Sequence, residues 1–198
     1  MILCLIFLVL CTAAELTQEQ QDYLDAHTAV RAGVDPPAKN MQPLAYEVTL
    51  EAKAKGYVSN CTTVRPQGDE YGNLGMTTLN VEKENLTESI IMALIAEGSK
   101  YNYTPNTCSD GSCTNYKQAV WAETNKCGCA TNECSSATGQ TEEGATLRPS
   151  SKTAFMICFY QPTGNITGER PYKTNSAPTM LSTVTMLISA MFAIHCYV

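Results

Sequence analysis

The chain has 198 residues, 10 cysteines, two histidines and a formal net charge of −6. Only 16% of its residues are charged, and residues 1–14 and 176–198 contain no Asp, Glu, Lys or Arg. The acidic balance and the lack of a basic run argue against a nucleic-acid-binding protein. Uncharged ends of this kind are typical of targeting segments, so we expect one globular domain between them.

The N-terminal segment has the pattern of a secretory signal peptide. Residues 2–10 are almost all apolar, and the small residues Thr12, Ala13 and Ala14 follow. About ten apolar residues are too few to span a bilayer, which takes roughly 20. We therefore predict that residues 1–14 are removed on secretion and that the mature protein begins near Glu15, outside the cell.

The spacing of apolar residues in the first half predicts three helices. The first begins at the capping-box sequence Thr17-Gln-Glu-Gln20 and ends near Arg31, before a glycine and a pair of prolines. The second is predicted over residues 44–61 and the third over residues 86–95, with residues 66–75 as a loop.

Strand patterns replace helical ones after Cys113. Strands are predicted over residues 116–124, 127–130 and 153–160, and a polar loop over 135–152 separates the last two. Helices first and strands afterwards predict an α+β fold in which helices pack on a sheet.

In a secreted protein, cysteines are expected to form disulfides rather than to bind metals. Three cysteines fall in the two hydrophobic ends, and seven remain in the body: Cys61, Cys108, Cys113, Cys127, Cys129, Cys134 and Cys158. The group at 127–134 lacks a second CxxC pair and a nearby His, so disulfides are favoured over zinc. Because seven is odd, one thiol is left over.

Four Asn-x-Ser/Thr sequons are typical of an exported glycoprotein. They lie at Asn60, Asn85, Asn102 and Asn165. The sequence predicts glycosylation without selecting among these sites.

The hydrophobic C-terminal tail, residues 176–198, has features of a glycosylphosphatidylinositol signal. It ends the chain without the basic residue that usually follows a single-pass helix. The small residues Asn175-Ser-Ala precede it, with Asn175 as the attachment residue. A retained hydrophobic tail and plain secretion remain as alternatives.

Four segments, in the right order, resemble the CAP superfamily of cysteine-rich secretory, antigen 5 and pathogenesis-related proteins. They are His27-Thr-Ala-Val-Arg31 with residues 36–41, Asn106-Thr-Cys108 with Cys113, residues 115–130, and residues 158–172. The resemblance covers residues 16–173 and is strongest to the venom allergen-like proteins of parasitic worms. It implies that residues 15–175 form a three-layer α-β-α sandwich stabilised by disulfides.

The resemblance also implies how the cysteines pair. The family pattern gives Cys61–Cys134, Cys108–Cys113 and Cys129–Cys158, which leaves Cys127 as the free thiol. Two interpretations of Cys127 stay open. It is either an inert thiol within a strand or the link of a covalent dimer through an intermolecular disulfide.

Many family members have a cleft with two histidines and two glutamates, whose histidines can bind a divalent metal. By resemblance, His27 matches the first histidine and Glu97 matches one glutamate. Gly72 stands at the position of the other glutamate, and Asn115 at that of the second histidine. Zinc needs at least three protein ligands, and an Asn amide oxygen is a poor one. The degenerate cleft therefore predicts neither a metal nor another cofactor.

No sequence motif places a catalytic nucleophile beside His27 and Glu97, so we predict a protein that is not an enzyme. The favoured interpretation is an extracellular interaction module, secreted or attached to the outer cell surface, that engages an extracellular or host protein. The alternative is an extracellular carrier of a sterol or fatty acid, which requires an apolar groove. The stretch over residues 72–81 and the third helix are the segments that would form it.

Overall fold

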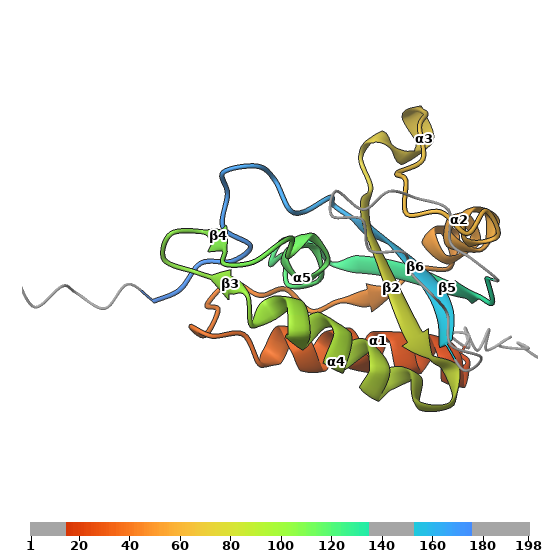
Figure 1. Cartoon of the computed structure of the whole chain (residues 1–198), viewed down its shortest axis with the longest axis horizontal. Coiled ribbons are helices and arrows are strands. Elements are labelled where there is room, and N and C mark those ends of the chain that lie inside the picture. The colour runs from red at the N-terminus through yellow and green to blue at the C-terminus, as the bar shows by residue number, and fades with distance from the viewer. Residues whose placement is uncertain (1–14, 135–152, 176–198) are drawn as a thin grey trace, which may run out of the picture.

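The computed structural model describes residues 15–134 and 153–175. Three layers are visible in Figure 1, where a central sheet lies between one helix on one face and a pair of helices on the other. The predicted signal peptide, the loop at 135–152 and the tail at 176–198 lie outside the described residues. Within the described ranges, no helix combines the length and apolar character needed to cross a bilayer.

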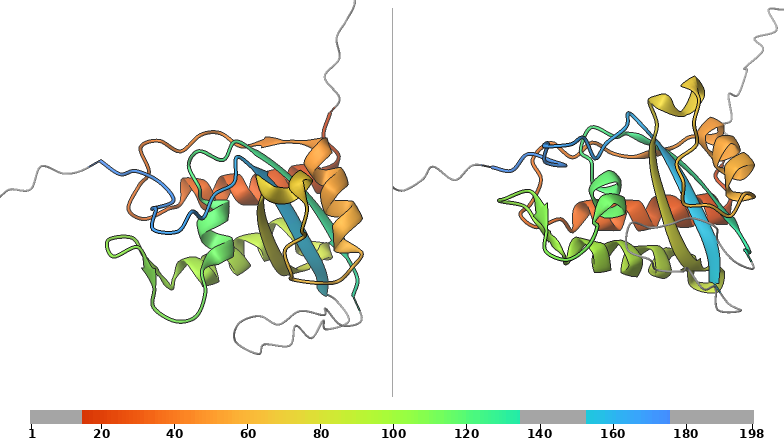
Figure 2. Two further views of the ribbon diagram at one scale, coloured as in Figure 1. Left: turned by 90° about the horizontal axis from the view of Figure 1, so that it is seen from above. Right: turned by 45° about the horizontal axis from the view of Figure 1, so that its top comes forward.

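Helices α1 (Gln18–Ala32) and α4 (Leu86–Gly98) form the paired layer and lie side by side in both views of Figure 2. The predicted capping box is present at Thr17, whose hydroxyl accepts a hydrogen bond from the backbone N–H of Gln20 at 3.3 Å. A 3-10 turn, η1 (Lys83–Asn85), leads into α4. The first and third predicted helices are therefore confirmed.

The central sheet has the strand order β1 (Ala45–Tyr46), β5 (Lys126–Asn132), β6 (Thr153–Gln161) and β2 (Gly75–Glu82). Strand β1 runs parallel to β5, and the other two pairs are antiparallel. A separate pair, β3 (Tyr101–Asn102) and β4 (Thr107–Cys108), lies at one end of the molecule. The predicted strands at 127–130 and 153–160 correspond to β5 and β6.

Strand β6 divides the core into two halves because its side chains alternate between the two faces of the sheet. Met156, Cys158 and Tyr160 pack in the half formed with α1 and α4. Phe155, Ile157 and Phe159 pack in the half formed with α2 (Val48–Val58). Both faces are thus covered, which confirms the predicted α+β fold of three α-β-α layers.

The second predicted helix begins too early at residue 44. Residues 45–46 instead pair with β5, and Glu47 caps α2 by accepting the N–H of Thr49 at 3.3 Å. The first turn of α2 packs directly on Gly128 of β5, where a Cβ atom would collide with the backbone of Glu51. Local helical spacing does not reveal this strand pairing, because β5 is about eighty residues away in the sequence.

The predicted strand over residues 116–124 is wrong, because this segment begins with helix α5 (Thr114–Ala119). Tyr116, Ala119 and Val120 are buried at helical spacing against the α1–α4 layer. Aromatic and β-branched residues at 116–121 favoured a strand. A short helix, α3 (Asp69–Gly72), also lies within the predicted loop at 66–75.

Three disulfides link the layers and loops of the domain: Cys61–Cys134, Cys108–Cys113 and Cys129–Cys158. These are the pairs that the family resemblance implies. Cys129–Cys158 joins β5 to β6 inside the core, where both residues are fully buried.

Candidate functional site

His27 lies on the buried face of α1 and has no exposed surface. Its Nδ1 lies 2.7 Å from the backbone carbonyl of Tyr23, and its Nε2 lies 2.6 Å from the hydroxyl of Tyr160. Because a carbonyl only accepts, Nδ1 carries the proton. The Tyr160 hydroxyl then donates to Nε2 and itself accepts from the hydroxyl of Thr77 at 2.9 Å.

Burial is the main cause that lowers the pKa of His27 from its ordinary value of 6.5 to about 4; the hydrogen bond to the Tyr23 carbonyl opposes this shift, and the nearby Arg31 guanidinium adds to it. Burial also raises the pKa of Tyr160 well above its ordinary value. The imidazole and phenol are therefore both neutral at physiological pH. Both nitrogens of this neutral ring are hydrogen-bonded inside the core, so at physiological pH neither is free to bind a metal or to act as a base.

Glu97 and Asn115 are brought together, as the resemblance suggests. The Asn115 amide donates to Glu97 Oε1 at 2.6 Å, and the backbone N–H of Tyr116 donates to Oε2 at 3.0 Å. The Asn115 oxygen accepts from the backbone N–H of Thr78 on β2 at 2.9 Å. The carboxylate thus lies at the N-terminal end of α5, where negative charge is stabilised, and joins α4 to α5.

The structure places His27 in a different environment from the Glu97–Asn115 pair. The two groups are connected through adjacent residues of β2. Thr77 hydrogen-bonds to Tyr160, which in turn hydrogen-bonds to His27, and Thr78 hydrogen-bonds to Asn115. Within the described ranges, no hydrogen bond or ion pair joins His27 to Glu97. The assignment of His27 to an open cleft is therefore corrected, since its ring belongs to the core.

Gly72 ends α3 and is exposed, with open space where a side chain would project. Sequence reasoning missed Arg65, whose guanidinium donates to the backbone carbonyls of Tyr71 and Leu74 on either side of this corner. A fixed positive charge beside Gly72 disfavours a bound cation. The sequence shows that residue 65 carries a positive charge, but only the folded structure shows that this charge lies against residues 71–74.

The residues present do not fit a metal centre at the cleft that the resemblance describes. Of the four predicted positions, only Glu97 offers a charged ligand atom, and both of its oxygens accept hydrogen bonds. A second grouping, His27 with Cys129 and Cys158, brings three ligand atoms within 4.8 Å of one another. Its two sulfurs are joined in a disulfide, so they are not thiolate ligands.

Cys127 is the free cysteine of the described chain and is fully buried on β5. Burial raises the pKa of its thiol to about 12, and the nearby Arg31 guanidinium opposes this only in part. A thiol that is both inaccessible and protonated does not react readily. The interpretation of Cys127 as the link of a covalent dimer does not fit this position, whereas the inert-thiol interpretation does.

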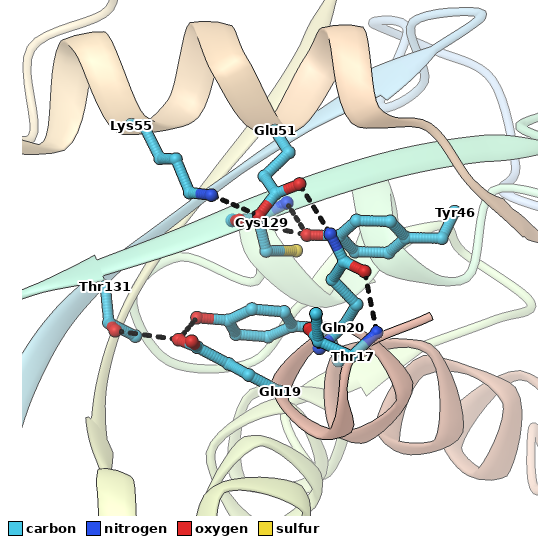
Figure 3. Close-up of polar contacts among 9 residues, drawn as sticks. Thr17, Glu19, Gln20, Tyr46, Glu51, Lys55, Cys129 and Thr131 are labelled. Atoms are coloured by element: carbon cyan, nitrogen blue, oxygen red, sulfur yellow. Dashed lines mark hydrogen bonds and ion pairs between the residues drawn. The ribbon is translucent and has the colours of Figure 1, made fainter. Parts of the chain in front are cut away.

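A polar network ties the start of α1 to α2 and β5, as Figure 3 shows. Glu19 accepts from the hydroxyls of Tyr23 at 2.7 Å and Thr131 at 3.3 Å. Glu51 accepts from Gln20 at 2.8 Å and pairs with Lys55 at 2.6 Å. Each carboxylate in this network is bound by side chains of the protein itself, so the network holds the layers together.

The described surface also contains a partly apolar pocket between α1 and α4, with a volume of about 340 Å³. Ala29, Val30, Ile91 and Ile95 contribute to its lining, and Tyr101 and Tyr116 lie at the end near β3. Ile91 and Ile95 belong to α4, the third helix predicted from the sequence, which was expected to form one side of an apolar groove. The segment over residues 72–81 does not line this pocket.

Three of the four sequons and the candidate anchor residue lie at exposed positions. Asn60, Asn85 and Asn102 are exposed, and Asn165 is half-buried. Asn175, the last described residue, is exposed directly after the Ala38–Thr174 bridge.

A family model described as the cysteine-rich secretory protein family, CAP, matches residues 24–158. The chain therefore belongs to the CAP family. Mouse (Mus musculus) peptidase inhibitor 16 is 30% identical over 164 residues, which cover 82% of this chain and 31% of that protein. Tobacco (Nicotiana tabacum) pathogenesis-related protein 1B is 28% identical over 171 residues, which cover 85% of this chain and 89% of that protein. The chain spans about a third of the length of the first curated relatives it matches.

Solved structures show the same fold. Schistosoma mansoni venom allergen-like protein 4 superimposes with a TM-score of 0.60 at 25% identity, covering 81% of this chain and 97% of that one. NaASP2, solved with Zn²⁺, gives a TM-score of 0.58 at 20% identity, and the match covers 83% of this chain and 90% of that one. The second match shows the fold alone, and its zinc belongs to that protein.

Proposed function

We propose that this CAP protein is an extracellular interaction module that acts on another protein without a metal and without catalysis. CAP membership and the venom allergen-like neighbour support an extracellular role. The hydrogen bonds that both Glu97 oxygens accept and the burial of His27 support an inactive cleft. Peptidase inhibitor 16 is named for an effect on another protein, which is the kind of role proposed here.

The observation that carries this proposal is an apolar surface on α4. Met92 is 58% exposed and Ile95 is 51% exposed, and they lie three residues apart on the same side of the helix. Large apolar side chains gathered next to a partly apolar pocket are typical of protein-binding surfaces. The opposite layer offers a single comparable side chain on α2, Val48, which is 57% exposed.

The test is saturable binding of the secreted, deglycosylated protein to cells, measured by flow cytometry in EDTA and again with Zn²⁺. We expect saturable binding that EDTA does not change and that protease treatment of the cells abolishes. Met92→Asp with Ile95→Asp should weaken it at least tenfold, whereas Val48→Asp should leave it within twofold. Binding that needs Zn²⁺, or that both sets of variants weaken equally, would contradict the proposal.

The pocket between α1 and α4 favours a second candidate, the sterol or fatty-acid carrier. Its walls combine apolar side chains with the polar residues Asp35 and Ser99, and its volume of about 340 Å³ is near the lower end of the range for small-molecule sites. Ala29 is exposed and lines this pocket, so Ala29→Trp should fill it. Ala32 lies on the same helix but lines a different pocket, which makes Ala32→Trp the matched control. A carrier would lose bound lipid with the first variant and keep it with the second.

A further inference from the structure

Among the described residues, six lysines and arginines form no ion pair with a carboxylate, and three of these six gather at one end of this acidic protein. Five lysines form ion pairs with carboxylates, but Lys39, Arg170 and Lys173 form none within the described residues. These three line a single open pocket of about 520 Å³. Glu169 is the one carboxylate in that lining, so the pocket is locally positive on a chain of net charge −6.

The backbone around this pocket, which we call the Lys39–Lys173 pocket, is held by long-range pairing. Ala38 and Thr174 form an antiparallel bridge, and the N–H of Lys39 donates to the carbonyl of Lys173 at 2.8 Å. The N–H of Lys173 donates to the Asn40 side chain at 2.7 Å. The two lysines therefore project from segments that are fixed against each other, although they are far apart in the sequence.

Arg170 is oriented by the loop between β3 and β4, which lies beside the C-terminal segment in Figure 1. Its Nε donates to the carbonyl of Tyr103 at 3.0 Å and its Nη2 to that of Thr104 at 2.6 Å. The guanidinium lies 5.4 Å from the centre of the Tyr103 ring, which stacks at 5.0 Å on Tyr172. These contacts use two of the five N–H donors of Arg170 and leave the others for a ligand.

We propose that the Lys39–Lys173 pocket binds a sulfated extracellular glycan. Lys39, Lys173 and the free donors of Arg170 match sulfate groups, which are compact anions with several acceptor oxygens. Tyr103 adds an aromatic ring, and Glu169 and Thr174 add groups that hydrogen-bond sugar hydroxyls. Because Arg170 and the Tyr103 ring are already oriented, their part of the binding loses little conformational entropy. This site is separate from the α4 surface and does not depend on it.

An anionic membrane is the competing ligand, and the shape of the site argues against it. Amphipathic surfaces that insert into membranes combine cations with protruding apolar side chains. None of the exposed large apolar side chains of the described chain lines this pocket. The pocket is also concave, which suits a short run of sugars better than a flat lipid surface, and a sugar hydroxyl can donate to Glu169.

The test is the affinity of the secreted, deglycosylated protein for a heparin-derived octasaccharide, measured by surface plasmon resonance at 50 mM and 150 mM NaCl. We expect Lys39→Gln with Lys173→Gln to weaken binding at least tenfold, and higher salt to weaken wild-type binding. Lys83→Gln with Lys126→Gln removes the same charge elsewhere and should change affinity less than twofold. Full chemical desulfation of the octasaccharide should cost at least tenfold.

Four outcomes would overturn the proposal. They are no wild-type binding, an equal loss in both double variants, undiminished binding of the desulfated octasaccharide, and binding to phosphatidylserine vesicles in place of the octasaccharide. Because the purified octasaccharide contains no protein, failure here is distinguishable from failure of the proposed protein interaction at α4.

Discussion

The buried neutral His27 makes the stability of this domain depend on pH in a way that one substitution should remove. Its pKa is about 4 in the folded protein and 6.5 in the unfolded chain. Between these values the unfolded chain binds a proton that the folded protein does not bind. Stability is therefore fully present above pH 6.5 and is lost as the pH falls toward 4.

The size of the loss follows from the two pKa values. Each pH unit within this window costs about 1.4 kcal/mol, and we expect about 2 kcal/mol between pH 7 and pH 5. His27 is the one histidine among residues 15–175, and carboxylates of ordinary pKa titrate mainly below pH 5. The effect of His27 should therefore dominate this window.

The assay is urea unfolding at pH 7 and pH 5, followed by circular dichroism, for wild type and for His27→Gln. The variant should be less stable at both pH values but should lose less than about 0.5 kcal/mol between them. Tyr160→Phe is the matched control, because it removes the partner of Nε2 while leaving the titrating ring in place. A His27→Gln protein with the full wild-type loss would refute the reasoning.

Three further predictions follow from single contacts. Cys129→Ala should cost about 2–5 kcal/mol and reduce secretion, and normal secretion with an unchanged Tm would refute the Cys129–Cys158 assignment. Glu97→Gln should lower the Tm by about 2–6 °C because it replaces one of the two acceptor oxygens that bind the Asn115 amide and the Tyr116 N–H with a donor, whereas the exposed Glu88→Gln on the same helix should not. Cys127 should react with Ellman's reagent only after unfolding, and rapid reaction of the native protein would show that the thiol is accessible.

Much of the fold could be predicted because its signals are local. The capping box at Thr17 marks the start of α1, and the continuous apolar run at 154–160 marks a strand covered on both faces. The helix at 114–119 could not be predicted in this way. Its start depends on the Glu97 carboxylate, which lies 19 residues earlier and accepts the Tyr116 N–H.

The candidate site was harder to predict because the environment of each of its residues depends on residues far away in the sequence. His27 could be matched to a family histidine, but its ring is bound by Tyr160, which is 133 residues away. The burial of Cys127 likewise depends on how β5 packs between β1 and β6. The Lys39–Lys173 pocket arises only when the two chain segments pair, so neither lysine stands out in the sequence.

Native mass spectrometry tests the central claim most directly. Residues 15–175, secreted from a eukaryotic host and enzymatically deglycosylated, would be exposed to Zn²⁺, desalted and weighed. The account predicts the mass of the protein alone, with no zinc and no lipid, because the cleft lacks a ligand set and function lies in surface contacts. Stoichiometric zinc would contradict the inactive cleft, and a discrete lipid mass would make this protein a carrier.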